Sequence, residues 1–265
     1  MTVQPASAQA PPLASTLNAM EPALRQSTLG RPLVIQAKEG PNGLQGDVFA
    51  IIEHTPADIA RQLSTPAAWC AAMMLHLDNR TCEVGAAGSS AAITLGVVRR
   101  YDQPASSASR IIFNFSLPSA GPRYFDARLT ATAGPFGTSD YRIRLEAIPV
   151  GDRRSFVHFA YAYRTSTWTD VALQAYLSTF GRSKVGFTQV GTLANGAPDH
   201  VRGAQGLLER NAMRYFLAVD AFLDADTPLA RQNAWYASSE RYPRQLHEVD
   251  RPTYLRLKGA DAAGR

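Results

Sequence analysis

The chain has 265 residues, of which 45% are hydrophobic and 18% are charged, and its formal net charge is +5. This composition is that of a folded globular protein and excludes an intrinsically disordered chain. Its apolar runs are all shorter than the roughly 18 residues that a membrane-spanning helix needs, and its two cysteines are too few for a disulfide-built scaffold or a cysteine-rich metal site. The basic residues are scattered rather than gathered in runs, so we expect no nucleic-acid partner.

The two ends of the chain differ in character. Residues 1–30 are rich in Ala, Pro, Ser and Gln without a clear apolar period, and we expect a flexible leader there. Residues 7–10 have the small-x-small pattern of a signal-peptidase site, but the charged and apolar regions that should precede such a site are absent. Residues 225–265 carry several aromatic side chains, which indicates an extension that packs on the domain.

The domain between these ends begins with two strands and two short helices. Strands are expected at 33–38 and 47–53, with a turn at 39–43 because its Asn-Gly pair tolerates positive φ. Helices should begin after Thr55 and after Thr65, because each threonine can cap a helix and the proline that follows it fits the first turn.

From residue 81 onward the sequence is strand-like. Tyr141, Ile143 and Leu145 alternate with Arg142 and Arg144, and period two with one apolar face predicts an antiparallel sheet that is wet on one side. The last of the expected strands is apolar on both faces, so the sequence does not decide which of them points inward. The expected strands are 81–85, 92–101, 110–117, 123–133, 139–148 and 155–164.

One long helix is available to cover the apolar face of this sheet. Between residues 206 and 223, apolar side chains recur at helical spacing; Asn211 lies on the same stripe, whereas Arg210 and Arg214 lie off its centre. A shorter helical stretch is expected at 169–179. The stripe that should face the sheet consists of Leu208, Ala212, Tyr215, Val219 and Phe222.

The expected fold is therefore α+β, with a curved antiparallel sheet wrapped around a long C-terminal helix and two short helices between the early strands. Three segments accompany this order. They are Gly-Pro-Phe-Gly-Thr-Ser-Asp-Tyr-Arg-Ile at 134–143, Phe-Gly-Arg-Ser-Lys-Val-Gly-Phe-Thr at 180–188, and Val-Arg-Gly at 201–203 with Glu-Arg-Asn-Ala-Met-Arg-Tyr at 209–215. With them, residues 31–224 resemble the START-like helix-grip (SRPBCC) superfamily, and within it a group of bacterial exported proteins of poorly defined function.

Members of this superfamily commonly bind apolar ligands between the sheet and the helix, and the resemblance implies the same here. We expect the chain to bind or carry a lipid-like small molecule without a cofactor, a role compatible with transient membrane contact. Small residues such as Ala127, Ala131 and Ala212 would leave room for it. The expected ligand-binding residues are Phe113, Phe115, Phe125, Leu129, Tyr141, His158, Asn211 and Tyr215.

Several of these residues have ordinary structural interpretations. Tyr141, Asn211 and Tyr215 could orient the polar end of a ligand, or they could simply hydrogen-bond within the core. His158 lies between two apolar residues and is better explained as a hydrogen-bonded structural histidine.

Two other functions stay open. An enzyme of the aromatase/cyclase type would need an acid/base pair inside the cavity, and the sequence shows no such pair, no HExxH motif and no GxSxG elbow. A structural or interaction module would have a filled core. The volume and polarity of the space between sheet and helix would separate these alternatives.

The two cysteines flank a predicted helix–strand corner. Cys70 lies near the end of the second short helix and Cys82 lies just inside the next strand, so their Cα atoms could approach within the bridging limit of about 7 Å. The alternative is a pair of buried free thiols. The resemblance to exported proteins favours the disulfide, and a disulfide indicates a periplasmic or secreted protein rather than a cytoplasmic one.

Overall fold

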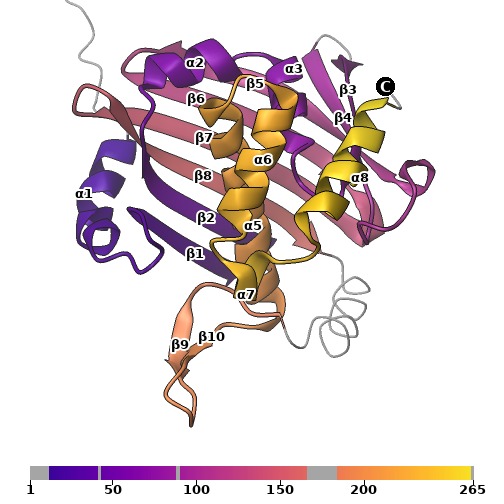
Figure 1. Cartoon of the computed structure of the whole chain (residues 1–265). Coiled ribbons are helices and arrows are strands. Elements are labelled where there is room, and N and C mark those ends of the chain that lie inside the picture. Colours follow the sequence, from indigo (N-terminus) through magenta and orange to yellow (C-terminus); the bar gives the residue numbers. More distant parts are fainter. Residues whose placement is uncertain (1–11, 41–42, 88–89, 166–183, 264–265) are drawn as a thin grey trace, which may run out of the picture.

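The computed structural model describes residues 12–40, 43–87, 90–165 and 184–263 (Figure 1). Within them, eight strands form an antiparallel sheet in the order β1-β2-β8-β7-β6-β5-β4-β3. These strands are β1 Leu33–Gly40, β2 Gly43–Ile52, β3 Asn79–Ala87, β4 Ser90–Val97, β5 Ser109–Gly121, β6 Tyr124–Ala133, β7 Thr138–Val150 and β8 Arg154–Thr165. The described α-helices are α1 Pro12–Arg25, α2 Pro56–Leu63, α3 Pro66–Met73, α5 Gly203–Asp224, α6 Pro228–Ser239, α7 Pro243–Leu246 and α8 Arg251–Ala263.

Three helices cover one face of the sheet, which we call the inner face. Helix α5 contacts β1, β2 and β8, whereas α2 contacts β5 and β6 and α3 contacts β3 and β4. Figure 1 shows these helices lying across the same side of the sheet. The arrangement confirms the predicted α+β helix-grip architecture, with α2 and α3 between the early strands and the long helix α5 after the meander.

The alternation of side chains places a core on each face of the sheet. In β8, Val157, Phe159 and Tyr161 belong to the main core on the inner face, whereas Phe156 belongs to a second cluster on the opposite, outer face. The inward face of this strand, which the sequence did not decide, is therefore the one that carries Val157, Phe159 and Tyr161. Both faces are apolar because helices lie over both of them.

Helix α1 corrects the expectation of a flexible leader over residues 1–30. Leu13 and Leu24 in this helix are 3% and 4% exposed, and they pack with Phe49 and Phe156 on the outer face of the sheet. Leu13, Leu17 and Leu24 recur at helical spacing, which gives the helix one apolar side. The abundance of Ala, Pro and Gln around them hides this stripe in the sequence.

The two short helices begin at the predicted threonines. The Thr55 side chain accepts a hydrogen bond from the Asp58 amide, and the Asp58 carboxylate accepts one from the Thr55 amide, which completes a capping box. Thr65 caps α3 by accepting from the Ala68 amide. Helix α3 then turns into β3, and Cys70 and Cys82 form a disulfide across this corner with their Cα atoms 5.6 Å apart.

Removing this disulfide should destabilise the protein substantially. Its loop spans 12 residues in sequence, and the chain-entropy model assigns about 3 kcal/mol to a loop of this size. A variant with both Cys70→Ser and Cys82→Ser should lose about that much unfolding free energy in urea titrations. Wild type in reductant serves as the control and should behave like the double variant. Two alkylatable thiols in unreduced wild-type protein would contradict the expectation.

Helix α5 is buried on nearly all sides. Its predicted stripe is buried in the main core, with Leu208 and Ala212 fully inaccessible. A side chain at Gly46 on β2 would place its Cβ 2.9 Å from the Cβ of Ala212, so the alanine and the glycine let helix and strand approach closely. Ala212 therefore does not leave the empty space that we expected at this position.

The C-terminal residues pack against α5. Helix α6 contacts α5, and α8 contacts both α6 and β3. The Trp235 indole donates to the backbone oxygen of Arg214 and stacks on Tyr254 at a centroid distance of 4.9 Å. The Tyr254 hydroxyl donates to the Leu75 oxygen. These contacts cover α5 around Arg214, which is only 6% exposed, and Arg210 on the same helix is 2% exposed.

Two of the segments that carry the resemblance are joined by Glu209. This residue is fully buried, and its carboxylate accepts hydrogen bonds from the amides of Phe187 and Thr188 at 2.5 and 2.9 Å and from the Thr188 hydroxyl at 2.6 Å. Arg210 donates to the Val185 oxygen. Glu209 and Arg210 thus attach the segment before β9 to α5, which is a structural role.

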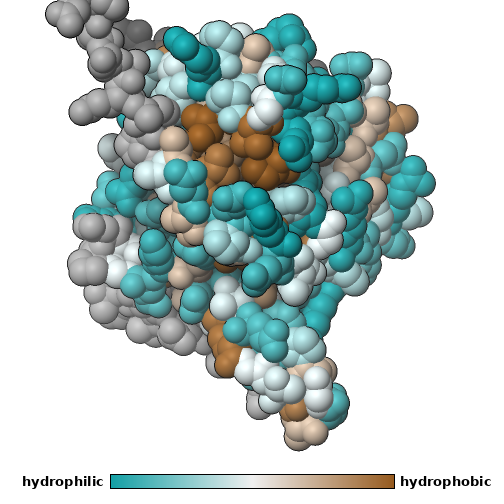
Figure 2. Space-filling model, turned by 90° about the vertical axis from the view of Figure 1, so that its left-hand side faces the viewer, coloured by the Kyte–Doolittle hydropathy of each residue, from teal (hydrophilic) through white to brown (hydrophobic). Residues whose placement is uncertain are grey.

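Two expectations concern the chain between the sheet and α5. The helix expected at 169–179 lies outside the described residues. A hairpin that the sequence did not reveal pairs β9 (Gln189–Thr192) with β10 (Pro198–His200). All four residues of β9 are exposed, and Figure 1 and Figure 2 both show the hairpin projecting from the body of the molecule.

Candidate functional site

Four tyrosines from three elements meet on the inner face, and we call them the tyrosine cluster: Tyr141, Tyr161, Tyr163 and Tyr215. Tyr141 comes from β7, Tyr161 and Tyr163 come from β8, and Tyr215 comes from α5. The Tyr141 and Tyr163 rings stack at 5.3 Å, and Tyr161 lies 5.3 Å from Tyr215. Alternation in β8 and the helical stripe of α5 direct these rings toward each other, so sheet and helix meet here through aromatic side chains.

The hydroxyls of the cluster differ in their partners. The Tyr141 hydroxyl lies 2.8 Å from the Thr138 hydroxyl, and the Tyr215 hydroxyl donates to the Asn79 side-chain oxygen at 3.3 Å. The Tyr161 hydroxyl makes no hydrogen bond within the part of the chain that the structure describes. Tyr161 is 7% exposed, and its burial raises the pKa of its phenol well above the ordinary value. It is therefore a neutral hydroxyl that can donate or accept a hydrogen bond.

Most of the expected ligand-binding residues lie on the inner face. The Phe113 ring meets Tyr141 edge-on at 6.2 Å. Phe125 and Leu129 are fully buried in the same core, on the strand that α2 covers. Phe115 is only partly buried at the margin of this core. These residues thus share the inner face of the sheet, which α2 as well as α5 covers.

Asn211 lies on α5 one turn before Tyr215 and is half-buried. Within the described residues its side chain makes no hydrogen bond, so the core hydrogen bond considered for it from the sequence is not found there. Tyr161 and Tyr163 were not among the expected site residues. The only signal for them was the doubly apolar pattern of their strand, which does not say which face points inward.

His158 lies on the outer face, so its assignment as a residue that binds a ligand beneath α5 is corrected. Its ring stacks on Phe49 at 4.6 Å, its Nε2 lies 2.7 Å from Asp47 Oδ1, and its Nδ1 lies 3.4 Å from Glu146 Oε2. The Tyr124 hydroxyl donates to the other oxygen of Glu146 at 2.5 Å. This array crosses the sheet from β2 to β6 on the face opposite the tyrosine cluster, so it does not provide an acid/base pair for a cavity beneath α5.

The His158 array makes stability depend on pH. Burial alone would lower the pKa of His158, but the hydrogen bonds to Asp47 and Glu146 more than offset it and raise that pKa. A raised pKa stabilises the fold below the unfolded-state value near 6.5 and loses this stabilisation as pH rises through the folded-state value. Urea midpoints should therefore fall from about pH 6 to pH 8 more steeply in wild type than in His158→Gln.

The comparison between these two proteins isolates His158 from other titrating groups. The pKa of His54 is also raised, through its hydrogen bond to Asp224, and that of the buried Lys258 is lowered to about 8. Both are present in wild type and in the variant. Parallel pH profiles for the two proteins would contradict the prediction.

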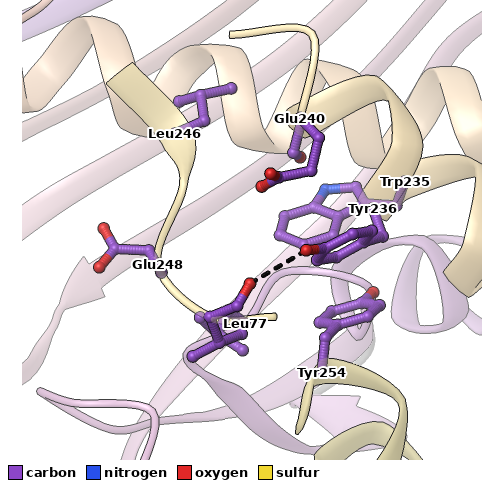
Figure 3. A pocket seen from close by; sticks show the side chains of 9 residues that line it. Leu77, Trp235, Tyr236, Glu240, Leu246, Glu248 and Tyr254 are labelled. Carbon is purple, nitrogen blue, oxygen red and sulfur yellow. Dashed lines mark hydrogen bonds between the residues drawn. The ribbon is translucent and has the colours of Figure 1, made fainter. Parts of the chain in front are cut away.

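Two hollows among the described residues lie away from the tyrosine cluster, and none of the four tyrosines lines either of them. The smaller has a volume of about 10 Å³, which is close to the minimum for one water molecule. Figure 3 shows the rings of Trp235, Tyr236 and Tyr254 gathered on one side of it, with Leu246 and Glu248 across from them. The buried Ser239 hydroxyl lines this hollow without a hydrogen-bond partner in the described chain. The larger hollow, of about 170 Å³, lies between α3, α6 and α8.

A buried histidine next to the cluster was also missed. The His76 ring stacks on Tyr215 at 4.6 Å. Its Nδ1 accepts a hydrogen bond from the Asp78 amide, and its Nε2 is buried without a partner in the described residues. Burial and the nearby Arg214 and Lys258 charges lower the pKa of His76 well below the ordinary value, so the ring is neutral.

The described residues show neither a membrane-spanning helix nor a metal-binding cluster. None of their helices is both long and apolar enough to cross a membrane. No group of three or more of their His, Cys, Asp and Glu side chains has a metal-binding arrangement.

Comparisons with known proteins found similarity in fold. No family model and no curated protein matches the chain. Among solved structures, Ara h 8.0201 matches with a TM-score of 0.41 and 9% identity over 69% of this chain and 98% of the other. Norcoclaurine synthase from Thalictrum flavum matches with a TM-score of 0.36 and 11% identity, over 68% of this chain and 88% of the other. A START superfamily protein from Mycobacterium smegmatis matches with a TM-score of 0.35 and 11% identity, over 46% of this chain and 77% of the other. At these values, the likenesses do not indicate what this chain binds or does.

Proposed function

We propose that the chain binds or carries an elongated apolar molecule between the inner face of the sheet and α5, with the polar end of that molecule at the tyrosine cluster. The observation that supports this proposal best is Tyr161, a residue only 7% exposed whose hydroxyl has no hydrogen-bond partner among the described residues. A ligand oxygen beside Tyr161 would give its hydroxyl a hydrogen-bond partner.

The surroundings of Tyr161 suit a ligand with one polar end. The rings of Tyr141, Tyr163 and Phe113 supply apolar area next to it, and sites for small molecules typically combine such walls with a few polar groups. Burying about 200 Å² of an acyl chain would contribute about 5 kcal/mol before the costs of association. Fatty acids and their esters are ligands of this kind.

The disulfide supports a proposal about location. Cys70 and Cys82 are bonded across the α3–β3 corner, and structural disulfides persist in oxidising compartments. A periplasmic or secreted protein that binds lipids fits this observation. Such a protein would exchange its ligand through transient contact with a membrane surface.

Titration with a dansyl-labelled fatty acid tests the proposed function. Wild type should bind the probe saturably, and Tyr161→Phe should bind it about tenfold more weakly because it keeps the ring and loses one hydrogen bond to a charged group. Tyr236→Phe is the matched control, because the Tyr236 hydroxyl donates to the Val249 oxygen away from the cluster. Absence of saturable binding, or equal affinities of wild type and Tyr161→Phe, would contradict the proposal.

A further inference from the structure

The larger hollow has walls of mixed character. Met74 and Leu75, just after α3, and Pro228 at the start of α6 give it apolar surface, whereas Arg231 and Gln232 of α6 and Lys258 of α8 give it polar surface. Its volume is about 170 Å³. An engineered apolar cavity of about 150 Å³ holds one benzene molecule. The hollow therefore has room for a molecule about the size of a single aromatic ring.

Arg231 is fixed in place but leaves donors unused. Its Nε donates to the Ala225 oxygen at 2.6 Å, and its guanidinium carbon lies 3.7 Å from the centre of the Phe222 ring. These contacts hold the planar group in one orientation. Within the described residues, no carboxylate lies within ion-pair distance of Arg231, and its two terminal nitrogens make no hydrogen bond. The guanidinium thus presents two NH₂ groups suited to a carboxylate.

The other charges near the hollow leave Arg231 as the group available to an anion. The Lys258 ammonium is occupied, because it donates to the Leu77 and Asn79 oxygens and lies 3.2 Å from Asp261. Helix α6 begins at Pro228, so the positive end of its dipole also lies at this wall. A ligand here would meet an apolar floor and the Arg231 guanidinium, with the Asp226 carboxylate near enough to act on the Arg231 charge without forming an ion pair with it.

We propose that this hollow binds a small apolar monocarboxylate, with its ring or short chain against Met74 and Leu75 and its carboxylate on the terminal nitrogens of Arg231. The site is lined by different residues from the tyrosine cluster, so it is a second site rather than part of the first. It takes a ring-sized acid, whereas the tyrosine cluster takes an elongated molecule.

Calorimetric titration of the full chain with benzoate tests this proposal. Benzoate should bind wild type saturably and bind Arg231→Gln at least about tenfold more weakly. Arg241→Gln, which removes an exposed arginine further along the chain, should match wild type. Benzamide has the shape of benzoate without its charge and should bind wild type at least about tenfold more weakly than benzoate does.

Labelling the methionine methyl groups with carbon-13 reports where benzoate binds. The Met74 signal, assigned through Met74→Leu, should shift on titration. Equal binding of benzamide and benzoate, equal binding of wild type and Arg231→Gln, no saturable binding, or an unshifted Met74 signal would each overturn the proposal. The benzamide and Met74 measurements use wild type, so they decide the question even where Arg231→Gln fails to fold. Fatty-acid binding and its dependence on Tyr161 are measured separately.

Discussion

Replacing Glu209 with alanine is expected to lower the free energy of unfolding by about 3 kcal/mol. The substitution removes three hydrogen bonds to a buried carboxylate and leaves the amides of Phe187 and Thr188 without their acceptor. Buried donors that lose a charged acceptor carry the full cost of desolvation. Urea-induced unfolding followed by circular dichroism measures the loss.

Two further variants separate this role from a general effect of removing charge. Glu209→Gln keeps one acceptor oxygen and should lose less stability than Glu209→Ala. Glu83→Ala removes an exposed glutamate on β3 and should change the unfolding free energy by less than about 0.5 kcal/mol. If Glu209→Ala behaves like Glu83→Ala, Glu209 does not hold the segment before β9.

Phe222→Ala should cost about 3–5 kcal/mol of unfolding free energy. Phe222 is 4% exposed near the end of α5, and its ring packs in the main core and under the Arg231 guanidinium. Truncation to alanine removes the ring and leaves a cavity where α5 meets α6. Chemical unfolding at several protein concentrations measures the loss independently of association.

Leu229→Ala is the matched control for Phe222. Leu229 is a large apolar residue near the same helix junction, but it is 60% exposed, so its truncation should cost less than about 0.5 kcal/mol. A loss below about 1 kcal/mol for Phe222→Ala would show that the end of α5 is not a stable part of the core.

The sheet and its covering helix could be predicted because each has a simple period. Alternation in β5 to β7 and the 3.6-residue stripe of α5 specify which side chains meet, and the threonine caps specify where α2 and α3 begin. The corner between α3 and β3 made the disulfide possible, and the resemblance to exported proteins favoured it over two free thiols. By contrast, α1 was hidden among abundant Ala, Pro, Ser and Gln, and the strands β9 and β10 have only four and three residues, too short for a periodic signal.

The candidate site was harder to predict than the fold. His158 and Tyr161 lie in one doubly apolar strand, and a one-residue shift of its inward face exchanges their roles. Only the packing of α1 on the outer face explains why this strand has two apolar faces. Ala212 was interpreted as empty space, whereas its neighbour across the interface is Gly46, on a strand 166 residues earlier in the sequence. A contact between such distant residues leaves no local pattern.

The binding of an apolar molecule at the tyrosine cluster is tested most directly by a crystal structure of the chain with a bromine-labelled fatty acid. Anomalous scattering locates the bromine independently of the protein phases. With the label on the carbon next to the carboxyl group, we expect a bromine peak beside Tyr161 and Tyr141, with a carboxylate oxygen within hydrogen-bond distance of the Tyr161 hydroxyl. A peak elsewhere, or a fully ordered inner face without bromine at saturating ligand, would contradict it.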